Sequence, residues 1–217
     1  MKRIVVMIVA VSFVVAAGIG VYQKQFYTDI NDWEDRMDYF QVAVISKDLV
    51  ESTISRMEEE LDNSRNIWLV KACGEVEYDF QIRKQLVEIE KVYKGEDAAE
   101  GDKVNVTYSG LVTYFEIMAM NTGFVNFLQE GKEYLIFLEG EIAGPWKEPY
   151  RVFEFNDYLI LPVFCLERME ERVPVTLEDE YSVDYAEVAG NEFFFKEAES
   201  FSMMNEWKAK LLERYVD

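Results

Sequence analysis

The first hydrophobic stretch of the chain runs from Ile4 to Tyr22 and contains no charged residue over nineteen positions. An α-helix needs roughly twenty apolar residues to cross the hydrocarbon core of a bilayer, so this stretch is long enough to span a membrane. Lys2 and Arg3 precede it and several acidic residues follow it. The positive-inside rule then leaves the N-terminus in the cytoplasm. We therefore expect a single-pass cell-membrane protein whose C-terminal part is extracytoplasmic.

A cleaved secretory signal is the alternative reading of residues 1–22. Ala16, Ala17 and Gly18 supply small residues near the end of the apolar run, although they match a cleavage site poorly. Cleavage would give a secreted protein instead of one anchored through residues 4–22. Both readings place the rest of the chain outside the cytoplasm.

Residues 29–62 carry apolar side chains at helical spacing, and acidic residues at the beginning of this stretch suit the positive end of a helix dipole. Ser46 is a candidate N-cap, so we expect two helices or one bent helix. Residues 23–65 are thus predicted to form a helical connector. The apolar positions are Trp33, Met37, Phe40, Val44, Val50, Ile54, Met57 and Leu61.

Residues 67–166 change to the alternation that is typical of half-buried strands. Three alternating runs are centred near Val70, Ile89 and Val106, whereas Tyr134–Leu138 is apolar on both faces and predicts a central strand. Two more runs follow, and Pro162 in the last one argues for an edge or a bend. Five or six short strands predict a small barrel and a mainly β (α+β) fold. The last two runs are Arg151–Phe155 and Tyr158–Leu166.

A helical pattern returns from Ser200, with Met204, Trp207, Leu211 and Tyr215 on one stripe. We expect this C-terminal helix to pack on the barrel. Residues 66–217 are therefore predicted to form one extracytoplasmic domain.

The stretch from Leu111 to Leu128 is too apolar for a solvated loop. We expect it to be a loop or short helix that folds over the barrel as a cap. The alternative is a groove for an apolar ligand or partner, with Phe115, Phe124 and Phe127 as its contact residues.

Three segments of the predicted barrel resemble a known family: Lys91–Glu96 (KVYKGE), Gly101–Val106 (GDKVNV) and Gly131–Leu138 (GKEYLIFL). Together they resemble extracytoplasmic proteins of Gram-positive bacteria that carry an OB-like barrel of the netrin and metalloproteinase-inhibitor (TIMP-like) type. The resemblance covers about residues 67–140 and implies a fold. The inhibitors begin with a cysteine that chelates the zinc of a protease, whereas both cysteines of this chain are internal, so that mechanism is not expected. OB barrels often bind oligonucleotides or sugars, which is an analogy of fold alone.

The charge of the chain argues against nucleic acid as a partner. Lys and Arg number 22 against 42 Asp and Glu, a formal net charge of −20. Lys2 and Arg3 are the only charges within residues 1–22, so residues 23–217 hold 20 basic and 42 acidic side chains, a charge of −22. Nucleic-acid affinity depends on cationic side chains that displace counterions from phosphates, and this domain has a surplus of the opposite sign.

Histidine is absent from the sequence, which removes Ser-His-Asp and Cys-His nucleophile activation and any metal site built on imidazole. The sequence predicts no cofactor. Cys73 and Cys165 lie on separate predicted strands, and a disulfide between them, two unpaired structural thiols or a reactive thiol all fit this pattern.

Two functions remain. The first is a non-catalytic, membrane-anchored module that binds a protein or a cell-envelope component. The second is a carboxylate-based envelope hydrolase, which rests on acidic clusters at residues 58–60, 170–171 and 178–180. Consecutive carboxylates point apart rather than converge on one atom, so the sequence favours the non-catalytic module.

Overall fold

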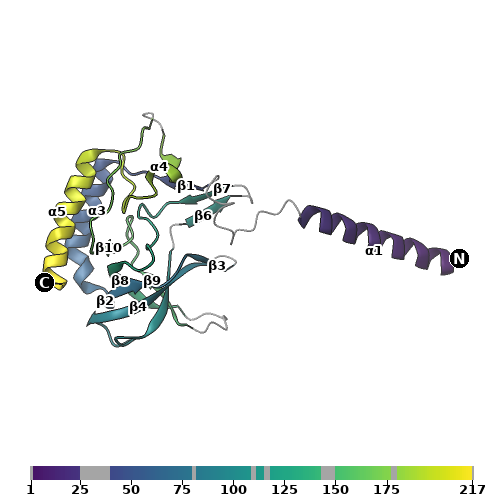
Figure 1. The fold of residues 1–217 in the computed structure, drawn as a ribbon, viewed down its shortest axis with the longest axis horizontal. Helices are drawn as coiled ribbons and strands as arrows, with labels where there is room; N and C mark the ends of the chain where they lie inside the picture. Colours follow the sequence, from purple (N-terminus) through teal and green to yellow (C-terminus); the bar gives the residue numbers. More distant parts are fainter. Residues whose placement is uncertain are drawn as a thin grey trace.

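The computed structural model describes residues 2–24, 40–79, 82–108, 111–114, 118–142, 150–176 and 180–216. Helix α1 (Lys2–Lys24) stands apart from the folded domain (Figure 1). Its described side chains, from Val11 to Tyr22, are exposed. Within the described residues, no helix is both long enough and apolar enough to cross a membrane.

Five strands close into a barrel whose order is β8–β2–β4–β5–β9, with β9 pairing back to β8. The pairs are antiparallel except β5 with β9, which are parallel. The prediction of a small, mainly β barrel within an α+β fold is therefore confirmed. The barrel strands are β2 (Asn66–Ala72), β4 (Ile82–Lys94), β5 (Lys103–Thr107), β8 (Glu133–Glu141) and β9 (Val152–Phe155).

Strand β8 is the central strand that its continuous apolar run predicted. Ile136 is fully buried and lies between Trp68 of β2 and Val163 of β10 (Val163–Cys165), which adds to the barrel beside β8. The predicted strand over Tyr158–Leu166 is shortened to β10, which begins directly after Pro162, as expected where a proline bends the chain. Strand β3 (Glu77–Asp79) forms a further antiparallel pair with β4.

A second, four-stranded sheet has the order β11–β1–β7–β6. The helical prediction for residues 29–62 is wrong at β1 (Phe40–Ala43), which is a strand of this sheet, and right for residues 47–60; residues 29–39 lie outside the described part of the chain. Phe40 and Val44 are four residues apart, a spacing that fits one face of a helix and equally one face of a strand, and pairing with β7 and β11 decides for the strand. The other strands are β6 (Leu111–Tyr114), β7 (Met118–Asn121) and β11 (Ser182–Asp184).

The stretch from Leu111 to Leu128 is likewise not a loop or a helix in its first part. Its described residues begin with an antiparallel hairpin, β6 and β7, and β7 is also paired on its other side with β1. The stretch is apolar because it supplies strands to a second sheet, and the prediction of a simple cap was wrong.

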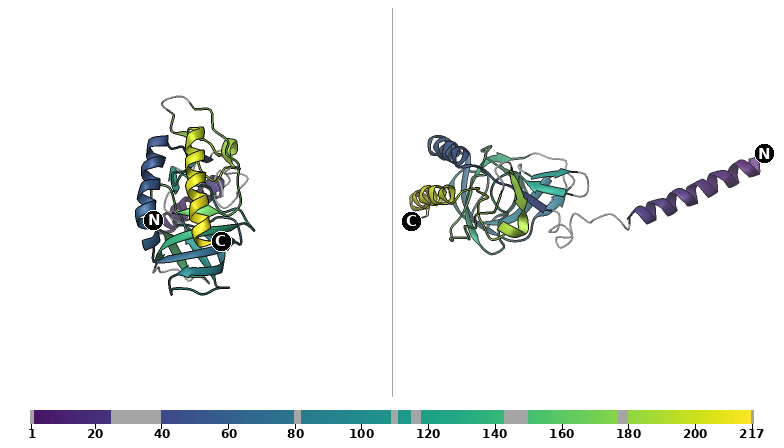
Figure 2. Two further views of the ribbon diagram at one scale, coloured as in Figure 1. Left: turned by 90° about the vertical axis from the view of Figure 1, so that its left-hand side faces the viewer. Right: turned by 90° about the horizontal axis from the view of Figure 1, so that it is seen from above.

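The two long helices of the domain lie together on one side of it (Figures 1 and 2). Helices α3 (Lys47–Glu60) and α5 (Ala198–Tyr215) are side by side, and the short 3-10 helix η1 (Leu61–Asn63) connects α3 to β2. Ser46 occupies the predicted N-cap position of α3, but its side chain makes no capping hydrogen bond. Met204, Trp207 and Leu211 of α5 are buried, as predicted. A single turn, α4 (Tyr185–Val188), follows β11.

Candidate interaction site

A cavity of about 300 Å³ lies where the barrel meets segments that lead out of the second sheet; we call it the junction groove. Strand β4 contributes one lining residue, the connection from β2 to β3 contributes two, the segment between β7 and β8 contributes four, and the start of α4 contributes one. The lining residues are Gln85, then Glu75 and Val76, then Phe127, Leu128, Gln129 and Glu130, and finally Tyr185.

Two backbone hydrogen bonds bring the two acidic residues of the groove together. The amide of Gly131 donates to the carbonyl of Ala72 at 2.9 Å, and the amide of Ala72 donates to the carbonyl of Lys132 at 3.0 Å. Gly131 has φ +82, a left-handed conformation that glycine adopts without a steric cost. The turn before β8 is thus held against the end of β2, so that Glu75 and Glu130 line the same cavity.

The floor of the groove is apolar and aromatic. The ring centroid of Phe127 lies 5.3 Å from that of Tyr108 on the barrel side and 5.8 Å from that of Phe40 in β1. Phe40 also packs edge-on against Tyr185 at 5.2 Å. These contacts join the barrel to the second sheet, so the floor is part of the core.

Gln85 is the polar group beneath the floor, and its amide is fully used inside the protein. Its Nε2 donates to the carbonyls of Gly74 and Leu128, both at 2.6 Å. Its Oε1 accepts from the hydroxyl of Tyr108 at 2.6 Å and from the amide of Leu128 at 3.1 Å. The hydroxyl of Tyr185 donates to Oδ1 of Asn126 at 3.0 Å. A buried amide with all its partners satisfied stabilises the groove and offers nothing to a ligand.

The rim carries the charge. Glu75 and Glu130 are exposed, and neither forms an ion pair with any residue in the described ranges. Glu77, close by, is paired with Lys84 at 3.6 Å, and Lys132 is paired with Glu167 at 3.2 Å. The groove therefore combines an apolar floor with two exposed carboxylates that have no described counter-ion.

The three phenylalanines predicted as contact residues have different positions. Phe127 lines the groove but is buried as a core residue. Phe124 is partly buried against the core at φ +55, and its carbonyl accepts from the amide of Phe194 at 3.0 Å. Phe115 lies outside the described residues. Sequence reasoning missed Glu75, Gln85, Glu130 and Tyr185, because nothing in the sequence shows that the turns at Gly74 and Gly131 adjoin.

The two cysteines are free. Cys165 and Val70 are paired with Tyr134 of β8 from its two neighbouring strands, and Cys73 lies three residues beyond Val70. With strands about 4.8 Å apart and a rise of about 3.3 Å per residue, the two cysteine Cα atoms are roughly 14 Å apart. A disulfide needs less than about 7 Å, so the bridge that the sequence allowed does not form in this fold. Burial raises the pKa of the Cys165 thiol, which makes it a poor nucleophile.

A buried ion pair lies on the helical side of the domain. Nζ of Lys208, in α5, donates to Oε2 of Glu192, and both side chains are 7% exposed. Oε1 of Glu192 accepts from the amide of Cys165 at 2.7 Å. Desolvation raises the pKa of the Glu192 carboxyl, and Lys208 opposes that rise. Every charge of this cluster has a partner, so we interpret it as a device that holds α5 on β10.

Within the part of the chain that the structure describes, no group of three or more acidic or cysteine side chains is placed to hold a metal ion. Comparison with known proteins adds no assignment: no protein-family model matches this sequence, and no curated protein matches it significantly.

Proposed function

We propose that this protein is a membrane-anchored, extracytoplasmic interaction module that binds a protein or a cell-envelope component in the junction groove. The observation that carries the proposal is the groove itself, in which an apolar floor meets exposed carboxylates without a described counter-ion. Ligand sites in proteins are typically concave and mostly apolar, with a few polar groups that give specificity. The volume of about 300 Å³ is at the small end of that range.

The anchored, extracytoplasmic location rests on the sequence of residues 1–22. Nineteen uncharged residues follow Lys2 and Arg3, and the remainder of the chain is strongly acidic. This arrangement supports a cytoplasmic N-terminus and an exported domain. Secretion after cleavage of the same segment is the alternative, and the groove would face the same compartment.

The connectivity of the barrel supports the OB-like type. Numbered along the chain, the barrel strands follow one another around the ring as first, second, third, fifth and fourth, and the third and fifth are parallel. A five-stranded Greek-key barrel of this kind is the OB fold, whose ligands contact the second and third strands and the loop between the first and second. The groove includes Gln85 of the second strand and Glu75 of that loop. This is support by analogy of fold.

The netrin and TIMP-like resemblance rests on turn motifs, and the local conformation is consistent with it. Gly95, Gly101 and Gly131, one in each of the three segments, have φ values of +102, +86 and +82. Each glycine therefore stands at a turn where a side chain would be strained.

No observation favours the alternative of an envelope hydrolase. A carboxyl that protonates a leaving group is usually shielded from water, whereas Glu75 and Glu130 are both exposed. Of the acidic clusters that motivated this alternative, Glu58, Glu59 and Glu60 are exposed on α3, and residues 178–179 lie outside the described part.

Site-directed photo-crosslinking in cells of the source organism tests the proposal. A photoreactive amino acid at Gln129, in the groove, should give a discrete adduct that disappears when an excess of the unlabelled full-length protein is supplied. The same amino acid at Lys210, exposed on α5, is the control and should not give that adduct. Absence of any competed adduct at Gln129, or the same adduct from both positions, would contradict binding in the groove.

A further inference from the structure

The chemistry of the junction groove limits what it can hold. Its buried polar atoms are already bonded within the protein: the amide of Gln85 makes four hydrogen bonds and the hydroxyl of Tyr185 bonds to Asn126. The charged groups that remain at its rim are the carboxylates of Glu75 and Glu130. Ionised carboxylates only accept hydrogen bonds, so the rim selects for a donor and repels an anion.

A ligand that fits both parts of the groove needs an apolar body and a cationic end. Val76, Phe127 and Leu128 can cover an aliphatic chain, and the two carboxylates can then neutralise the charge at its tip. Lys and Arg side chains have this construction, since their methylene stems pack on apolar surface while the charged group stays at the edge. The acidic surplus of the domain adds a longer-range attraction for a basic partner.

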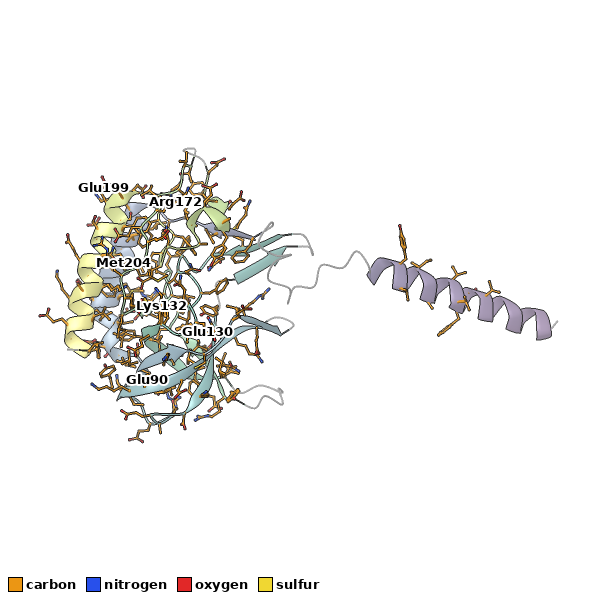
Figure 3. All side chains as sticks on the ribbon, in the orientation of Figure 1. Glu90, Glu130, Lys132, Arg172, Glu199 and Met204 are labelled. Carbon is orange, nitrogen blue, oxygen red and sulfur yellow. The ribbon has the colours of Figure 1, made fainter. Side chains whose placement is uncertain are left out.

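The strand beside the groove favours a polypeptide over a small amine. β3 begins at Glu77, directly after the groove residue Val76, and within the described residues it pairs with β4 alone. An extended peptide can add to such an edge, with main-chain hydrogen bonds for affinity and a pocket for alternate side chains. Figure 3 shows Glu130 well away from Met204 of α5, so this side of the domain is separate from the helical side.

We propose that the junction groove receives a Lys or Arg side chain from an extended, basic segment of a partner polypeptide. This inference rests on the proposed function and specifies its ligand. The partner's cation lies at Glu75 and Glu130, its aliphatic stem covers Phe127 and Leu128, and its backbone runs along the edge of β3.

Binding of short synthetic peptides to the full-length protein in detergent tests the inference. The probe is a fluorescent pentapeptide, Ala-Val-Lys-Val-Ala with blocked ends, and its matched controls carry norleucine or glutamate at the central position. Fluorescence anisotropy should show saturable binding of the lysine peptide, at least tenfold weaker binding of the norleucine peptide, and no binding of the glutamate peptide. Raising the salt concentration should weaken the lysine peptide more than the norleucine peptide.

Charge-neutralising variants separate a local site from general attraction. Glu75→Gln and Glu130→Gln should each weaken the lysine peptide by about two- to fivefold, and the double variant by about tenfold, as expected for exposed ion pairs. The control is Glu206→Gln with Glu213→Gln, which removes the same charge from exposed positions on α5 and should change affinity by less than twofold. Equal losses in both double variants, or no loss in the groove variant, would overturn the inference.

The two proposals fail in different ways. If the lysine peptide does not bind and crosslinking from Gln129 still captures a competed partner, the groove binds something else and only the basic-segment inference is wrong. If that crosslink is absent too, the proposed function itself is wrong.

Discussion

At the scale of single residues, the buried ion pair of Lys208 and Glu192 illustrates how a charge is tolerated in the core. Removing one partner of a buried pair leaves the other charge uncompensated, which typically costs about 3–5 kcal/mol. We therefore expect Lys208→Met to lower the free energy of unfolding by this amount at neutral pH. Replacing both residues, Lys208→Met with Glu192→Gln, should restore most of it, because glutamine keeps an oxygen for the amide of Cys165. Urea denaturation of the full-length protein in detergent measures both.

The pH dependence of Lys208→Met follows from the same pair. Desolvation already raises the pKa of Glu192 in the folded protein above its ordinary value, and loss of Lys208 removes an opposing attraction. A carboxyl with a raised folded-state pKa binds its proton more tightly when folded, so the stability that this carboxyl contributes is greatest below the unfolded pKa of about 4.3 and falls as pH rises above it. The deficit of the variant should be small near pH 4 and grow toward neutral pH. A deficit that stays constant over this range would show that Glu192 is not the uncompensated charge.

Ile136 gives a second prediction for a single residue. Its strand, β8, has a neighbouring strand on each side, and the residue itself is 0% exposed to solvent, so truncating its side chain leaves a cavity. Ile136→Ala should lower the free energy of unfolding by about 2–5 kcal/mol. Val175→Ala is the control, because Val175 is 92% exposed and its truncation should change stability by less than about 0.5 kcal/mol. Equal denaturation midpoints for the two variants would contradict the burial of β8.

At the scale of elements, helix α5 is held by its apolar stripe more than by its terminal ion pair. Trp207 packs edge-on against Phe164 of β10, with ring centroids 5.4 Å apart, and is buried. Arg214 binds both carboxylate oxygens of Asp62, but these two side chains are 55% and 54% exposed. Trp207→Ala should therefore cost about 3–5 kcal/mol of unfolding free energy. Arg214→Ala should cost at most about 1 kcal/mol. The reverse order in denaturation experiments would show that the ion pair, not the stripe, attaches the helix.

The elements that sequence reasoning located well are those whose side-chain period has one interpretation. α5 and the strands around Val70, Ile89 and Val106 are long enough for the period to be unambiguous, whereas β8 was located by its continuous apolar run. β1 is only four residues long, and the spacing of Phe40 and Val44, which lies just after the strand, fits a helix equally well. The β6 and β7 hairpin is apolar because of a sheet whose other strands come from distant parts of the chain, and local pattern does not contain that information.

At the scale of the whole molecule, the junction groove depends on closure of the barrel and on docking of the second sheet. Glu75 and Glu130 belong to two turns that are adjacent only because β2 pairs with β8. Phe127 and Tyr185 reach the groove because Phe40 of β1 packs on both rings. The turn motifs and the apolar segments can be recognised in the sequence, but the strand pairing that brings them together in space cannot. The candidate site was therefore beyond sequence reasoning, except for Phe127.

The orientation of the whole molecule gives the last prediction. If residues 4–22 anchor the protein with the N-terminus in the cytoplasm, an engineered cysteine in the domain faces the outside of the cell. Ser55→Cys, exposed on α3, in a Cys73→Ser background should react with a membrane-impermeant maleimide added to intact cells. Cys165 is buried and should stay unlabelled until the protein is denatured.

An uncharged epitope tag placed before Met1 should be found on the same labelled band and should bind antibody only after the cells are permeabilised. Labelled protein in the medium without the tag would show that residues 1–22 are a cleaved signal. Labelling at Ser55→Cys that requires permeabilisation would mean that the domain lies in the cytoplasm, and the proposed extracytoplasmic function would then be wrong.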